Sequence, residues 1–177
     1  MRIFIAIDLP SAVKREIEKN HKTIAANCRK SRIISTGNLH LTLKFLGEVE
    51  ENRLERVKRI MNEVAANVQR FELSTANWGK FKSRKGHIIW LGVGEAVNEL
   101  RQLAQRLNQG LKSINEPAGF SFQPHITVAR DALIDKDPAD WKQPAKISWT
   151  VRQIILYESV YHKRTIYYVK HRTELTN

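Results

Sequence analysis

Residues 40–43 read His-Leu-Thr-Leu, and residues 124–128 read Pro-His-Ile-Thr-Val. Each stretch holds a histidine and a threonine two positions apart, with one apolar residue between them: His40 with Thr42, and His125 with Thr127. In a β-strand, residues i and i+2 point to the same face, so each stretch would place an imidazole beside a hydroxyl. Two such strands facing one cleft would supply one imidazole to take a proton and another to give one. The pattern favours an enzyme that acts on a phosphodiester.

The chain contains two further His-x-Thr pairs, which we do not expect to act in the same way. His21 and Thr23 lie in a helix-like stretch, where residues two apart do not face each other. His171 and Thr173 lie near the C-terminus and have a charged residue between them. Only the pairs at 40 and 125 lie inside alternating, strand-like runs.

The two stretches belong to a larger repeat with a period of 85 residues. Shifting the chain by that amount aligns the apolar runs at residues 3–9 and 88–94, and the helix-like segments 11–28 and 96–113. Each half therefore begins with a strand, a helix and a histidine-bearing strand. A period near half of the 177 residues predicts one domain of two pseudo-symmetric halves, about 1–85 and 86–177.

The remaining segments predict an α+β protein. A helix is expected at 51–67, and residues 131–146 are expected to form a loop or a short helix. Strands are expected at 71–77, 87–93, 151–157 and 165–169. Two basic connections, residues 80–86 and 161–164, join these strands in pairs. The result is a bilobal, pseudo-symmetric fold of two antiparallel sheets, flanked by helices, with a central cleft.

Composition narrows the class of partner and compartment. The formal net charge of +12 favours a polyanionic partner, and RNA is the one we expect. Aromatic residues beside both basic connections favour the binding of single-stranded nucleic acid, whose bases can stack on them. The single cysteine, Cys28, indicates a reducing compartment, and we expect a cytoplasmic protein with no membrane segment.

The ordered set of motifs resembles the two-histidine (2H) phosphoesterase superfamily, and more closely its RNA 2′,3′-cyclic phosphodiesterases, formerly called 2′-5′ RNA ligases. The resemblance rests on the opening Arg-Ile-Phe-Ile-Ala-Ile-Asp-Leu-Pro at residues 2–10, on residues 38–48 around the first motif, and on residues 124–130 around the second. It implies metal-independent opening of a terminal 2′,3′-cyclic phosphate to a 2′-phosphomonoester. Some members of the family also join RNA ends through a 2′-5′ linkage.

The resemblance also implies roles for individual residues. His40 would be the acid at the leaving 3′-oxygen and His125 the base at water, an order that the sequence symmetry itself leaves open. Thr42 and Thr127 would bind the non-bridging phosphate oxygens. Two further candidates are Arg130, for the phosphate, and Phe45, for stacking on a base.

Strict alternation puts Arg130 and Phe45 on the face opposite the histidines, so each needs a bulge, a twist or a strand end to reach the site. Lys44 has the right parity, with a solvated position as the simpler alternative. We expect no metal and no cofactor, since no HExxH motif, glycine-rich phosphate loop or carboxylate cluster is present.

Two rival functions stay open. One is a non-catalytic RNA-binding module whose histidines are structural, and the other is a cyclic phosphodiesterase that acts on a small nucleotide. We expect a monomer that acts on RNA ends, tRNA fragments among them.

Overall fold

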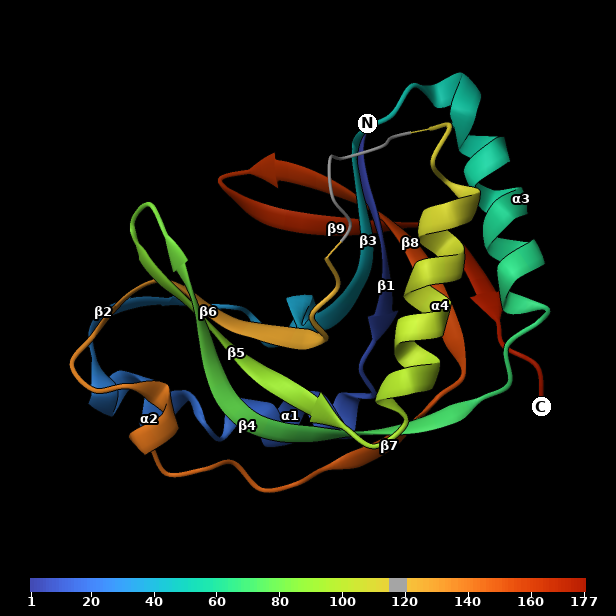
Figure 1. Cartoon of the computed structure of the whole chain (residues 1–177). Helices are drawn as coiled ribbons and strands as arrows, with labels where there is room; N and C mark the ends of the chain where they lie inside the picture. Colours follow the sequence, from blue (N-terminus) through green and yellow to red (C-terminus); the bar gives the residue numbers. More distant parts are fainter. Residues whose placement is uncertain (115–120) are drawn as a thin grey trace.

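The computed structural model describes residues 1–114 and 121–177, and this part of the chain forms a mixed fold of helices and one antiparallel sheet (Figure 1). The predicted α+β class is confirmed. In the described residues the sheet has nine strands, of which eight follow the order β7-β4-β5-β6-β3-β1-β8-β9, while β2 pairs with β6. The two predicted sheets are thus continuous.

The sheet divides into two lobes at its centre. The first lobe consists of β3 (His40–Glu48), β1 (Arg2–Asp8), β8 (Gln153–His162) and β9 (Arg164–Glu174). The second lobe consists of β6 (His125–Ile134), β5 (Gly86–Gly94), β4 (Phe71–Ser83) and β7 (Ser148–Val151), with β2 (Cys28–Ile33) at the edge. A single register pair, Leu41 with Ile126, joins β3 to β6 and therefore joins the lobes.

The lobes in space do not coincide with the two halves of the sequence. β8 and β9 come late in the chain, yet β8 pairs with β1 in the first lobe. β4 comes from the first half and pairs with β5 and β7 in the second lobe. Such long-range pairing ties the two halves together, which the sequence pattern could not reveal.

The helices form where the apolar spacing predicts them. α3 (Leu54–Ala65) and α4 (Val97–Gly110) pack on the first lobe, with α4 against β3 and α3 against β8 and β9 (Figure 1). The apolar residues that predict α3 are Leu54, Val57, Ile60, Met61 and Val64, all buried except Val64, which is half-buried; those that predict α4, Leu100, Leu103 and Leu107, are all buried. This burial is what stabilises both helices against the sheet.

Two expectations for local structure were wrong. The single helix expected over residues 11–28 is α1 (Ser11–Glu18) followed by α2 (His21–Asn27), because the Asn20 side chain binds the carbonyls of Glu16 and Ile17 and ends α1. The loop expected from Asp131 begins later, since β6 continues to Ile134 where it pairs with β2. Strand β2 was missed because its exposed side chains are mostly basic.

The two faces of β1 bury different clusters. Ile3, Ile5 and Ile7 belong to the main core. Phe4 and Ala6 point to the other face, where they pack with a smaller cluster that includes Tyr157. The second face is therefore also apolar and aromatic near β1.

Candidate functional site

The two His-Thr pairs meet at the centre of the sheet. Leu41 and Ile126 are register partners and both are fully buried in the main core. Opposite residues of an antiparallel pair share a face, so their neighbours along each strand point to the other face. That face, here the motif face, is defined by six side chains: His40, Thr42, Phe45, His125, Thr127 and Arg130.

His40 opens β3 and is held at both ring nitrogens. Its Nδ1–H donates to the carbonyl oxygen of Asn38 at 2.7 Å, and its Nε2 lies 3.1 Å from Oγ1 of Thr42. A carbonyl only accepts, so Nδ1 carries the proton and Nε2 of the neutral ring accepts from the threonine hydroxyl. The rings of Phe4 and Tyr167 lie 5.0 and 5.2 Å from the imidazole.

His125 opens β6 in the same way. Its Nδ1–H donates to the carbonyl oxygen of Gln123 at 2.7 Å, again two residues before the histidine. Its aromatic neighbours are Phe81, with ring centroids 5.0 Å apart, and Trp90, at 6.0 Å. In both imidazoles Nε2 is therefore the nitrogen without a proton, and in His40 it accepts from the Thr42 hydroxyl.

Burial makes both imidazoles weaker bases than a free histidine. It lowers the pKa of His40 to about 4, although the Asn38 carbonyl and the Asp8 carboxylate act in the opposite direction. Burial also lowers the pKa of His125, opposed by the Gln123 carbonyl. The charge of Arg130 lowers both pKa values, so this guanidinium lies within electrostatic reach of both rings.

Matching β-bulges bring Phe45 and Arg130 to the motif face. The pairing of β3 with β1 skips a residue between Thr42 and Lys44, and the pairing of β6 with β5 skips one between Thr127 and Ala129. Each bulge shifts the alternation by one, so two buried residues follow each other in both strands before an exposed one. Of the bulge, twist or strand end that could bring Phe45 and Arg130 to the histidine face, the structure has the bulge in both strands.

Lys44 moves the other way. It is 3% exposed, and its Nζ donates to Oδ1 of Asn108 on α4 at 2.5 Å. The alternative of a solvated lysine is therefore wrong, and so is its assignment to the histidine face. The same bulge that brings Phe45 to the motif face turns Lys44 toward the helices.

The sequence did not single out the aromatic walls of the site. Phe4 and Tyr167 lie beside His40, and Phe81 and Trp90 lie beside His125. Phe81 and Tyr167 are among the aromatic residues near the basic connections, but nothing in the sequence indicates that they flank the imidazoles. A signal was present at Gly79, where an added Cβ would lie 2.1 Å from the Trp90 ring. The indole therefore lies flat across the neighbouring strand, which requires a glycine there.

The two basic connections are the turns of long hairpins, and both turns extend to the same side in Figure 1. β4 runs to Ser83 and β5 begins at Gly86, while β8 and β9 turn at Lys163. Arg84 and Lys85 are exposed, whereas Lys80 forms an ion pair with Asp137. The exposed cations of both turns remain available to an anionic partner.

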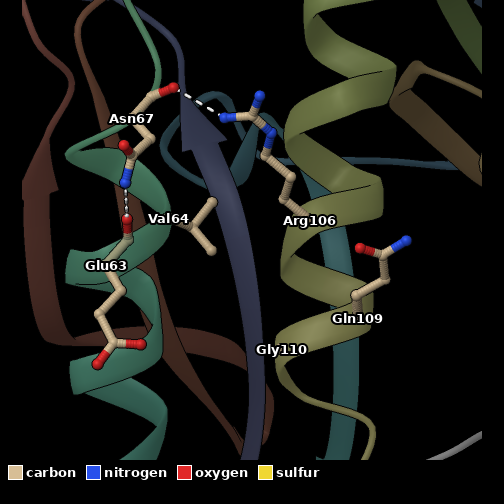
Figure 2. A pocket seen from close by; sticks show the side chains of 6 residues that line it. All are labelled: Glu63, Val64, Asn67, Arg106, Gln109 and Gly110. Atoms are coloured by element: carbon tan, nitrogen blue, oxygen red, sulfur yellow. Dashed lines mark hydrogen bonds between the residues drawn. The ribbon is translucent and has the colours of Figure 1, made fainter.

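A groove of about 390 Å³ lies away from the motif face, between α3 and α4. Figure 2 shows Arg106 reaching across it to donate to the carbonyl oxygen of Asn67 at 2.8 Å. That contact satisfies a carbonyl just beyond the end of α3 and supports the packing of the two helices. The groove carries none of the residues predicted from the motifs.

The described residues, 1–114 and 121–177, contain no group of three or more His, Cys, Asp or Glu side chains that could hold a metal ion. Within the same ranges, no helix is both long enough and apolar enough to cross a membrane.

Comparison with known proteins agrees with this arrangement. The chain is 31% identical to the RNA 2′,3′-cyclic phosphodiesterase of Escherichia coli (strain K12), over 99% of this chain and 97% of that protein. It is also 31% identical to the enzyme of the same name from Methanocaldococcus jannaschii, over 76% of this chain and 74% of that protein. The crystal structure of E. coli LigT complexed with 3′-AMP superposes with a TM-score of 0.86 at 30% identity, covering 99% of this chain and 98% of LigT.

A family model described as the 2′-5′ RNA ligase superfamily matches residues 9–161, a range that contains both His-Thr motifs and Arg130. The resemblance read from the sequence is therefore confirmed, and the chain belongs to the 2′-5′ RNA ligase superfamily.

Proposed function

We propose that this chain is an RNA 2′,3′-cyclic phosphodiesterase, which opens a terminal cyclic phosphate to a 2′-phosphomonoester by acid–base catalysis with His40 and His125. The observation that carries the proposal is the meeting of both His-Thr pairs on one face through the Leu41–Ile126 register pair. The names of the curated relatives support the substrate. The net charge of +12 favours RNA over a small nucleotide.

The proposed reaction uses one imidazole on each side of the phosphorus. Nε2 of His125 takes a proton from a water molecule as the water oxygen attacks phosphorus, and the bond between phosphorus and the ribose 3′-oxygen breaks. Nε2 of protonated His40 gives its proton to that 3′-oxygen, so the phosphate stays on the 2′-oxygen. An RNA 5′-hydroxyl in place of water would give a 2′-5′ linkage by the same steps.

Asp8 supports the order in which His40 is the acid. Asp8 is the register partner of His40, and its charge raises the His40 pKa, while Lys14, whose Nζ lies 2.6 Å from Oδ1 of Asp8, and Arg130 lower it. A bound phosphodiester adds a negative charge that acts in the same direction as Asp8 and favours the imidazolium. The influences on the His125 pKa include no carboxylate, which favours His125 as the ring that stays neutral and accepts a proton once the phosphodiester is bound.

The phosphate would be held from both strands. The hydroxyls of Thr42 and Thr127 and the guanidinium of Arg130 would donate to the non-bridging oxygens. Phe45, which is 45% exposed on this face, offers a ring on which a base can stack. We place the activity in the cytoplasm and expect a monomer that acts on RNA ends, tRNA fragments among them.

The decisive experiment incubates the purified protein, in excess EDTA, with an oligonucleotide that ends in a 2′,3′-cyclic phosphate. His40→Ala and His125→Ala are run beside it, with His171→Ala as the matched control. His171 also belongs to a His-x-Thr pair, but it lies on β9 and binds Oδ1 of Asn62 at 2.8 Å. We expect a 2′-phosphate product from the parent and from the control, and none from the two motif variants.

The other outcomes identify the rivals. Binding of the oligonucleotide without turnover by the parent would favour an RNA-binding module. Turnover that survives both motif substitutions would reject the two-histidine mechanism. Equal turnover of a cyclic mononucleotide and the oligonucleotide, unaffected by salt, would favour a small-nucleotide enzyme, because phosphate contacts make RNA binding salt-dependent.

A further inference from the structure

Two arginines lie opposite each other beside the candidate phosphate site. Arg32 on the edge strand β2 and Arg130 on β6 are register partners. Like charges at directly opposed positions repel and lower stability. Oδ2 of Asp131 lies 3.1 Å from Nε of Arg32, so one carboxylate balances only part of the charge of the pair. The arrangement leaves a net positive charge that an anion would stabilise.

A third arginine approaches the same face from the first lobe. The Arg2 guanidinium lies over the Phe45 ring, 5.1 Å from its centroid. Phe45 in turn stacks on Phe4, with ring centroids 6.5 Å apart. The exposed ring proposed for base stacking is therefore already accompanied by a cation, at the end of the aromatic row that begins at His40.

Tyr167 connects the three arginines in space. Its ring meets the His40 imidazole edge to face, 5.2 Å away. Burial raises the pKa of the Tyr167 hydroxyl, and the charges of Arg130, Arg2 and Arg32 all act against that rise. The contacts place the arginines on the same face: the ring under Arg2 stacks on Phe4, which meets Tyr167 edge to face at 5.0 Å. Arg32 lies opposite Arg130, and register partners in an antiparallel pair share a face.

This is more positive charge than one cyclic phosphate needs. The reacting phosphate is a monoanion, for which Arg130 and two threonine hydroxyls supply donors. The next anion in an RNA strand is the phosphate on the 5′ side of the terminal nucleotide. We propose that Arg2 and Arg32 form a second phosphate subsite that binds this 5′-side phosphate while the terminal base stacks on Phe45.

The proposal rests on the proposed function and adds a specificity to it. The enzyme should distinguish a cyclic-phosphate nucleoside from the same nucleoside carrying a 5′-phosphate group. Hydrogen bonds between arginine and phosphate are charge-assisted and stabilise the bound substrate more than neutral hydrogen bonds do. Two such contacts should therefore give a preference of about tenfold or more in kcat/KM for the substrate with the 5′-side phosphate.

The test compares three substrates: adenosine 2′,3′-cyclic phosphate, its 5′-phosphorylated form, and a dinucleotide that ends in a 2′,3′-cyclic phosphate. kcat/KM is measured for the parent, for R2Q/R32Q and for the control R56Q/R101Q. The control removes the same two charges from exposed positions on α3 and α4. The parent and the control should favour both substrates with a 5′-side phosphate, and R2Q/R32Q should lose that preference and show a smaller salt dependence.

The outcomes separate the subsite from the proposed function. Parent turnover that is equal for all three substrates, or a preference that R2Q/R32Q retains, would overturn the subsite and leave the proposed function intact. Absence of turnover with every substrate would instead overturn the proposed function. kcat/KM is also measured for the single variants R2Q and R32K, so that misfolding of the double variant does not decide the result. The melting temperature of each variant is recorded. In R2Q/R32Q the relief of repulsion between Arg32 and Arg130 offsets the loss of the exposed Arg32–Asp131 ion pair, so the melting temperature should change little.

Discussion

His40 and His125 occupy equivalent places at the starts of β3 and β6, but their surroundings differ. Both donate Nδ1–H to the carbonyl two residues earlier, at 2.7 Å in each case. Within the described residues, a threonine hydroxyl contacts Nε2 of His40 and the Asp8 carboxylate acts on the same ring, whereas His125 has neither influence. The repeated strand fixes the tautomer of both rings, whereas the surrounding side chains make the two rings chemically distinct.

The largest effect should come from the histidines themselves. His40→Asn and His125→Asn should each lower kcat by about 10²–10⁴-fold, because each removes a proton transfer. A diester with a nitrophenyl leaving group needs no acid, so His40→Asn should lose much less activity on it than His125→Asn does. Comparison of kcat on the two substrates checks this, and equal losses on the nitrophenyl diester would contradict the proposed order.

The charge of Arg130 acts on both histidines. Arg130→Gln should lower kcat/KM by about 10²-fold, as expected for removal of a charged donor to the phosphate. It should also raise the pKa of both histidines, since the charge of Arg130 lowers both. Imidazole titration by NMR measures the two shifts, and Arg130→Lys serves as the control that keeps the charge. A shift at only one histidine would show that Arg130 does not lie between them.

The threonines should differ where the histidines differ. Thr42→Val and Thr127→Val should each lower kcat by about 10-fold or more, because each removes a donor to the phosphate. Only Thr42→Val should also change the pKa of the neighbouring histidine in the free protein, since the Thr42 hydroxyl lies 3.1 Å from Nε2 of His40. Equal pKa changes in both variants would remove this distinction.

The pH dependence follows from the lowered pKa values. The reaction needs one imidazolium, and both histidines have pKa values below their usual value, with His40 at about 4. Because both pKa values lie below about 6.5, little imidazolium remains in the free enzyme above that pH, so kcat/KM should fall by about tenfold between pH 7 and pH 8. The optimum should lie between about pH 4 and pH 6.5. A flat profile from about pH 5 to pH 9 would count against the mechanism.

The smallest effect concerns stability. Because the folded-state pKa of His40 is lowered to about 4, the unfolded chain binds more protons between that pH and its own pKa near 6.5. The stability that neutral His40 provides is therefore complete above pH 6.5 and lost as the pH falls toward 4, by up to about 3 kcal/mol. Denaturant unfolding of the parent and His40→Gln across this window measures the difference. The free energy of unfolding of the variant should depend less on pH, and parallel curves would contradict the assignment.

Much of the fold could be predicted because apolar spacing reports local structure. The stripes of α3 and α4 and the motif strands were predicted from periodicity alone. The edge strand β2 could not be, since it buries little apolar surface and its partner, β6, lies about a hundred residues away in the sequence. The break at Asn20 also escaped, because it depends on a side chain that binds the helix carbonyls.

The sequence by itself determined the candidate chemistry of this protein. Two His-Thr pairs in strand-like runs predict two imidazoles and two hydroxyls, whatever the details of packing.

Only the tertiary structure decided which side chains join them. A bulge in each motif strand shifts the alternation and moves Phe45 and Arg130 to the histidine face, while Lys44 turns to the core. Pairing with β2 then sets Arg32 beside Arg130. The physical reason is that bulge position and strand partners depend on hydrogen bonds between segments far apart in the chain, which local periodicity does not record.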